Sequence, residues 1–230
     1  IKTATAPVPA RRPMMLTALD TINRAAQTAK TATAHASPQQ IAMNEVMEKP
    51  AFSEMAGQGD IDPAETRRIE TGLMAVNGVD PHQFLDYVHD IDLARISADP
   101  ALVAALDRLP GRKYVFTNGD AAYARRVLDK LGLANAFDGL HDIHAMAYVP
   151  KPDPRSYAAM CQLHSIEPER ALFVEDMARN LEPAKAIGMT TVWIDNGSEQ
   201  AGIGADPAFI DYRIADIGVW LSEITGKEKA

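Results

Sequence analysis

Two stretches of the sequence place polar side chains directly after an apolar run. The first, Thr117-Asn118-Gly119, follows the run 113–116 and offers a hydroxyl, a carboxamide and backbone N–H groups ahead of a predicted helix. Such donors at a helix N-terminus favour the binding of an anion. Taken alone, this stretch is more commonly an ordinary turn with a helix-capping residue.

The second stretch is acidic. Glu175-Asp176 follows the apolar run 171–174, and Asn180 comes shortly afterwards. Two adjacent carboxylates repel each other, and a bound divalent cation would relieve that repulsion. Oxygen ligands with few histidines nearby favour Mg²⁺. The alternative is that Asp176 caps the following helix, which explains one acid but not the pair.

A lysine between two prolines, Lys151, lies in the segment that separates the two stretches. Pro150 and Pro152 restrict the backbone and can therefore aim the ammonium group, although a surface lysine in a proline-rich loop is the commoner case. The order favours a functional interpretation, because a hydroxyl, a lysine and an acid pair follow one another across successive elements. Together they predict a site for a phosphate group and a magnesium ion.

The elements around these residues are predicted to alternate between short apolar strands and amphipathic helices. Asp99-Pro100 and Asp153-Pro154 each supply an N-cap acceptor before a proline suited to the first helical turn. The alternation predicts an α/β fold, a parallel sheet with helices on both faces and a site beyond the carboxyl ends of the strands. The expected strands are 113–117, 138–143, 171–175, 190–194 and 210–214, and the expected helices are 100–109, 121–131, 154–164, 178–187 and 215–224.

The composition is that of a globular protein with an acidic surface. The 230 residues include 23 Lys and Arg against 31 Asp and Glu, a formal net charge of −8. This charge argues against nucleic acid or an anionic membrane as the main partner, whereas a small phosphorylated metabolite needs only a local positive site. A single cysteine, Cys161, and the lack of a long apolar run favour a cytoplasmic protein. The oligomeric state stays open.

Several dispersed motifs resemble the haloacid dehalogenase (HAD) superfamily of hydrolases. Thr117-Asn118-Gly119 looks like its second motif, Lys151 like its third, and Glu175-Asp176 with Asn180 like its fourth. The resemblance extends over about residues 71–195 and is greatest to the pyrimidine 5′-nucleotidase-like branch. The stretches similar to that branch are 71–74, 79–81, 84–90, 148–152 and 175–181.

The resemblance implies a Rossmann-like core with a small helical cap. It implies a Mg²⁺-dependent phosphomonoester hydrolase, acting on a nucleoside 5′-monophosphate through an aspartyl-phosphate intermediate. Residues 1–20 would be an N-terminal segment with a candidate first core strand, 21–95 the helical cap, with helices at 38–48, 63–76 and 81–89, and 96–230 the α/β core. The implied phosphate-binding residues are Thr117, Asn118, Gly119 and the catalytic Lys151, and the implied metal site is Asp176, supported by Glu175 and Asn180.

The first motif of the family, a strand ending in Asp-x-Asp-x-Thr with the nucleophile, is absent from the sequence. Met14 to Asp20 is an apolar run that ends in an acid, but Ile22 stands where the second Asp of the motif belongs. Three interpretations follow: the first 60 or so residues differ from the natural sequence, the chain binds phosphate without turnover, or Asp20 is an unusual nucleophile. A metal-independent 2-haloacid dehalogenase is a further alternative on the same core.

Overall fold

The computed structural model describes residues 2–3, 14–16, 89, 92–94, 96–197 and 199–226. The chain divides into two compact units, Ile1–Ala26 with Asp92–Ala230, and Gln27–Ile91. Nearly all described residues belong to the first unit. The predicted helical cap over 21–95, with its helices at 38–48, 63–76 and 81–89, therefore lies almost wholly outside the described residues and stays a prediction.

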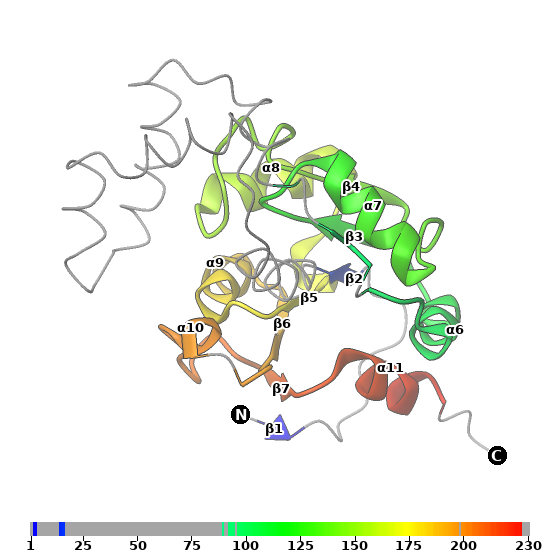
Figure 1. The fold of residues 1–230 in the computed structure, drawn as a ribbon. Coiled ribbons are helices and arrows are strands. Elements are labelled where there is room, and N and C mark those ends of the chain that lie inside the picture. The colour runs from blue at the N-terminus through cyan, green and yellow to red at the C-terminus, as the bar shows by residue number, and fades with distance from the viewer. Residues whose placement is uncertain are drawn as a thin grey trace, which may run out of the picture. The chain divides into compact units, whose positions relative to one another are not determined.

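Seven strands form a single parallel sheet in the first unit (Figure 1). All of the pairings are parallel, so the carboxyl ends of the strands share one edge of the sheet. The expected α/β fold is thus confirmed. The strands, in their order across the sheet, are β1 (Lys2–Thr3), β7 (Tyr212–Ile214), β6 (Thr190–Ile194), β5 (Leu172–Glu175), β2 (Met14–Leu16), β3 (Lys113–Phe116) and β4 (Gly139–His141).

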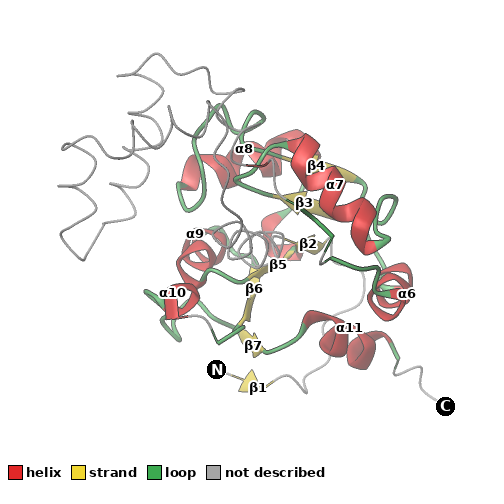
Figure 2. Cartoon of the chain, in the orientation of Figure 1, coloured by secondary structure: helices red, strands yellow, loops and turns green. Residues whose placement is uncertain are grey.

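Helices alternate with these strands along the chain and cover both faces of the sheet (Figure 2). α8 contacts α9, and α6 contacts α11, with the two pairs on opposite sides of the sheet in Figure 1. In the described part of the chain, no helix has the length and apolar character needed to cross a bilayer. The helices are α6 (Pro100–Arg108), α7 (Ala121–Leu131), α8 (Pro154–His164), α9 (Leu181–Ala186), α10 (Glu199–Gly202) and α11 (Ile217–Thr225), with 3₁₀ turns η1 (Pro168–Arg170) and η2 (Ala178–Asn180).

Aspartate side chains fix the start of the helices that precede and follow the site loops. Asp99 accepts hydrogen bonds from two backbone N–H groups of α6, Asp120 accepts one from Tyr123 in α7, and Asp153 accepts one from Arg155 in α8. The two predicted Asp-Pro helix starts are therefore confirmed. Satisfying these N–H groups stabilises each helix by about 1 kcal/mol.

The helix predicted over 178–187 is divided in the structure into η2 and α9. Pro183 lies in the first turn of α9, where a missing N–H is tolerated. In a continuous helix, the residue at position 183 would donate its N–H to the carbonyl of Arg179, and proline has no N–H to donate. The segment after β5 therefore makes a tight 3₁₀ turn before α9 begins, and this turn shapes the loop that carries the acid pair.

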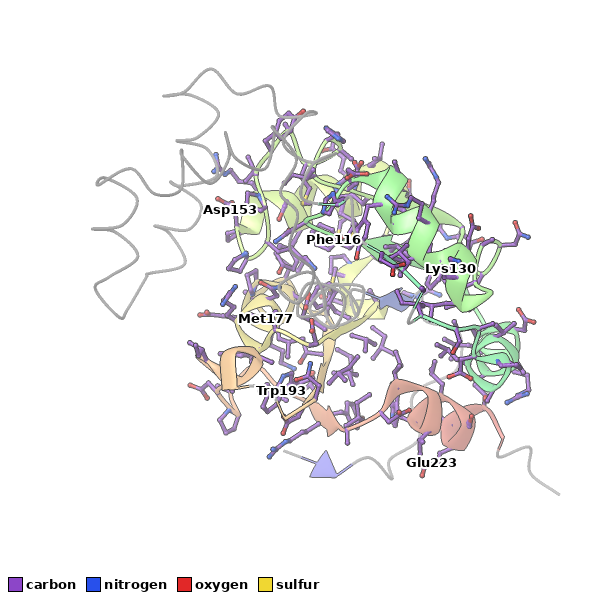
Figure 3. The ribbon with its side chains drawn as sticks, in the orientation of Figure 1. Phe116, Lys130, Asp153, Met177, Trp193 and Glu223 are labelled. Carbon is purple, nitrogen blue, oxygen red and sulfur yellow. The ribbon has the colours of Figure 1, made fainter. Side chains whose placement is uncertain are left out.

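An aromatic cluster packs between the sheet and α8. The ring of Phe116 from β3 lies 5.2 Å from Tyr157, 6.2 Å from Phe173 and 5.5 Å from His141, measured between ring centroids. Figure 3 shows Phe116 in the interior and Lys130 at the periphery. His141 is fully buried, and within the described residues neither of its ring nitrogens has a hydrogen-bond partner. Burial, and then the neighbouring His164, lower the pKa of His141 to about 4.

Acid is expected to destabilise the fold through His141. The ring is neutral in the folded state, while in the unfolded chain it binds a proton with a pKa of 6.5. Its stabilising contribution is therefore complete above pH 6.5 and is lost progressively as the pH falls towards 4. At pH 5 the loss of unfolding free energy is about 2 kcal/mol.

In urea unfolding at pH 7.5 and pH 5, a His141→Phe variant should show a smaller difference in unfolding free energy between the two pH values than the wild type. A Met160→Ala control, which changes a buried but non-titrating side chain, should keep the full difference; equal behaviour of the two variants would contradict the assignment.

Candidate active site

The site lies at the carboxyl edge of the sheet, where β2 runs between β3 and β5. Leu16 at the end of β2 pairs with Val115 on one side and with Val174 on the other. The polar residues Thr117 and Asp176 follow these two neighbouring strands. The topology therefore brings the two predicted polar stretches to either side of the end of β2.

Lys151 links the ends of the two strands that flank β2. Its Nζ donates to the backbone carbonyl of Phe116 at 3.0 Å and to Oε2 of Glu175 at 2.8 Å. Both side chains of the Lys151–Glu175 ion pair are fully buried. The ammonium also lies 5.1 Å from the centroid of the Phe116 ring. Lys151 is thus a fixed buried cation, and the alternative of a surface lysine is wrong.

The backbone of Lys151 is held by the side chain of Asn118. The Asn118 carboxamide accepts from the Lys151 N–H at 2.8 Å and donates to the Lys151 carbonyl at 3.2 Å. Both ends of the carboxamide are therefore engaged by the loop that carries the lysine. This geometry gives the Asn118 side chain a positioning role for the lysine loop. The contact of Asn118 with phosphate that the resemblance implies stays a prediction.

Thr117 and Gly119 form a tight turn directly after β3. The Gly119 N–H donates to Thr117 Oγ1 at 3.0 Å. The Thr117 oxygen therefore accepts a hydrogen bond, while its own hydroxyl hydrogen can be directed towards an anion. The N–H of Gly119 is engaged within this turn, so Thr117 is the better placed donor of the two.

The loop 175–180 after β5 is fixed by hydrogen bonds along its length. Oε1 of Glu175 accepts from the N–H groups of Asp176 at 3.1 Å and Met177 at 3.0 Å. Since its other oxygen accepts from Lys151, both oxygens of Glu175 have protein donors. The carboxylate of Glu175 thus orients the lysine and the loop, which leaves Asp176 as the acid of the pair with the better chemistry for a metal ion.

Asp176 and Asn180 have the oxygen chemistry of a magnesium site. Both are buried, Asp176 completely and Asn180 at 3% exposure. The N-cap positions of η2 and α9 are Met177 and Asn180, and neither side chain caps its helix. The Asn180 oxygen Oδ1 accepts no hydrogen bond from any described residue. A buried acceptor without a donor beside a buried carboxylate is suited to a cation.

Two aromatic residues outside the sequence motifs also contact this loop. The indole Nε1 of Trp193 donates to the carbonyl of Asp176 at 2.9 Å, and the hydroxyl of Tyr157 donates to the carbonyl of Asn180 at 2.6 Å. Trp193 is buried, at 6% exposure. Its contact with the loop had no signal in the sequence, since an apolar strand does not reveal where an indole N–H points.

The other candidate groups do not form a second site. Among the described residues, no cluster of three or more His, Cys, Asp or Glu side chains could hold a metal ion. A magnesium site does not need such a cluster, because Mg²⁺ keeps several waters and binds one or two carboxylates. Burial raises the pKa of the Cys161 thiol to about 11, so it is protonated at neutral pH and unsuited to nucleophilic attack.

Comparisons with known proteins relate the chain to hydrolases. It is 32% identical over 145 residues to a phosphoglycolate phosphatase of Rhodospirillum rubrum, covering 60% of this chain and 59% of that protein. It is 29% identical over 117 residues to a phosphoglycolate phosphatase of Mesorhizobium japonicum, covering 50% and 51%. The chain therefore spans between half and three fifths of the length of these curated relatives.

The fold also matches solved structures. L-2-haloacid dehalogenase from Xanthobacter autotrophicus superposes with a TM-score of 0.56 at 17% identity, covering 94% of this chain and 99% of that one. A model of the haloacid dehalogenase-like hydrolases matches residues 20–188, which is more than half of the sequence. The match includes the turn after β3, the lysine loop and the acidic loop after β5. The chain therefore belongs to the haloacid dehalogenase-like hydrolase family.

Proposed function

We propose that the protein is a Mg²⁺-dependent phosphomonoester hydrolase. The observation that carries the proposal is the buried Lys151 ammonium, fixed between the ends of β3 and β5. A preorganised cation in a buried site stabilises negative charge that develops on a transferred group. The names of the two curated relatives support phosphatase chemistry for the same family.

Each residue of the site has a role in this proposal. The hydroxyl of Thr117 donates to a phosphate oxygen, and Lys151 neutralises the phosphate charge while Asn118 and Glu175 hold the lysine in place. Asp176 and Asn180 are the residues that would hold Mg²⁺. When bound, Mg²⁺ would neutralise the charge of the transferred phosphoryl group.

The nucleophile is expected from the segment that follows β2. Leu16 pairs with Val115 and with Val174. The polar residues Thr117 and Asp176 each lie two positions after these two valines. The same count along the sequence from Leu16 leads to Ala18, and Asp20 stands two residues further on. The candidate Asp20 lies outside the described residues. By this count an alanine stands at the first acid position of Asp-x-Asp, so turnover would require Asp20, two residues further on, as the nucleophile.

The alanine at position 18 favours a second candidate function, the binding of a phosphorylated metabolite without turnover. The same lysine, hydroxyl and metal ligands would hold a phosphate group in either case. The two functions differ only in whether an acid attacks phosphorus. A nucleoside 5′-monophosphate stays the expected substrate from the branch resemblance, and 2-phosphoglycolate is the alternative that the curated relatives introduce.

Phosphate release from UMP, CMP, AMP and 2-phosphoglycolate, with Mg²⁺ and with EDTA, tests the proposal. We expect release that requires Mg²⁺ and is lost in Asp20→Asn, because this change removes the candidate nucleophile. Ala18→Asp separates the candidates, because it should create turnover in a chain that only binds. No release by the folded wild type on any substrate would overturn the hydrolase proposal. Chloride release from 2-chloropropionate in EDTA would instead support the dehalogenase alternative.

A further inference from the structure

We infer that Tyr157 and Trp193 are positioning residues that clamp the loop 175–180 in the geometry required to bind the metal ion. This inference rests on the proposed magnesium site. The two residues come from different elements: Tyr157 lies in α8 and packs against Phe173 of β5, and Trp193 lies in β6, which pairs with β5. Their donors reach the backbone carbonyls of Asp176 and Asn180, the two residues assigned to the metal.

Both donors are rigid and stay protonated. Tyr157 is fully buried, and its ring packs against Phe116 and Phe173 at centroid distances of 5.2 and 5.6 Å. A tyrosine hydroxyl is protonated at physiological pH and can therefore donate to the carbonyl of Asn180. Its short bond to the Asn180 carbonyl fixes the end of the loop.

Trp193 fixes the start of the loop. Its indole is buried, and the guanidinium of Arg213 lies 5.1 Å from its ring centroid on the solvent side. Arg213 is itself held by an ion pair with Asp195. Figure 3 labels Trp193 and Met177, the residue after Asp176, at neighbouring places on this side of the sheet. The tryptophan ring thus cannot turn away from the Asp176 carbonyl without leaving its packing.

The clamp opposes a specific electrostatic problem. The Asp176 carboxylate is fully buried, and in the absence of a bound cation the cost of burying its charge would favour a movement of Asp176 towards solvent. Hydrogen bonds to the backbone carbonyls of Asp176 and Asn180 hold the backbone in place. The direction of each of these two side chains is then set by its own rotamer. Outer partners of metal ligands typically change metal affinity by about 10–100-fold.

The test measures Mn²⁺ binding from the electron paramagnetic resonance signal of the free ion. Tyr157→Phe and Trp193→Phe should each weaken binding by about 10-fold or more. Both variants keep an aromatic ring, so packing is largely retained. The matched controls are Tyr114→Phe and Trp220→Phe, buried residues of the same types in β3 and α11, and these should bind Mn²⁺ as the wild type does.

Activity gives a second readout. Saturating Mg²⁺ should restore kcat in the two clamp variants, because the metal ligands themselves are unchanged. Clamp variants that bind Mn²⁺ as tightly as the wild type, with only their Tm lowered, would overturn the inference while leaving the metal site intact. A wild type that binds no Mn²⁺ would overturn the metal site of the proposed function and the clamp with it.

Discussion

Replacement of Lys151 by methionine is expected to lower kcat by about 10²–10³-fold. The ammonium is the cation that the structure fixes at the ends of both strands flanking β2. Methionine has a similar length but no charge, so stabilisation of the developing phosphate charge is lost. The variant should also lose about 3–5 kcal/mol of unfolding free energy, because the buried Glu175 carboxylate is left without its partner.

A double variant separates the two effects. Lys151→Met combined with Glu175→Gln removes both buried charges, and glutamine keeps an oxygen for the N–H groups of Asp176 and Met177. Stability should then return most of the way to the wild-type value, while kcat stays low. Lys185→Met is the matched control, since Lys185 forms a partly exposed ion pair with Asp211 away from the site. A double variant that regained turnover would show that Lys151 acts only on folding.

Local sequence signals predicted the elements of the core with little error. The helices 121–131 and 154–164 and the strand 190–194 have the same bounds in the structure, because caps, glycine stops and apolar periodicity act within one or two turns. The strand expected over 138–143 is confined to Gly139–His141. The position of β2 between β3 and β5 depends on pairing with two strands that are distant in the sequence, which no local pattern encodes.

The residue types of the site could be predicted, but their division of roles could not. Motif order placed Thr117, Lys151 and Asp176 at the same edge of the sheet. Only the tertiary structure reveals that Asn118 binds the backbone of the lysine and that Glu175 uses both oxygens within the protein. Hydrogen-bond partners of this kind are set by strand register and loop path, which sequence spacing leaves undetermined.

The division between Glu175 and Asp176 leads to the second large expected effect. Asp176→Asn should weaken Mn²⁺ binding by at least the roughly 10–100-fold seen for outer partners of metal ligands, because it removes a ligand charge rather than a supporting contact. The side chain keeps its size and one oxygen. Unlike the clamp variants, it should not recover wild-type kcat at saturating Mg²⁺. Titration of phosphate release against Mg²⁺, alongside Mn²⁺ binding, measures both quantities.

Asp142→Asn is the matched control for this change. Asp142 is a buried carboxylate that directly follows β4 at the same edge of the sheet, and it accepts from the N–H groups of Ala121 and Ala145. Asparagine has one side-chain oxygen instead of two, so it cannot accept both of these hydrogen bonds as aspartate does. This variant should therefore lose stability and yet keep its Mg²⁺ titration midpoint. An Asp176→Asn variant with an unaltered midpoint would remove Asp176 from the metal site. The buried oxygen of Asn180 would then require another partner, and the charge of Lys151 alone would have to neutralise the phosphate.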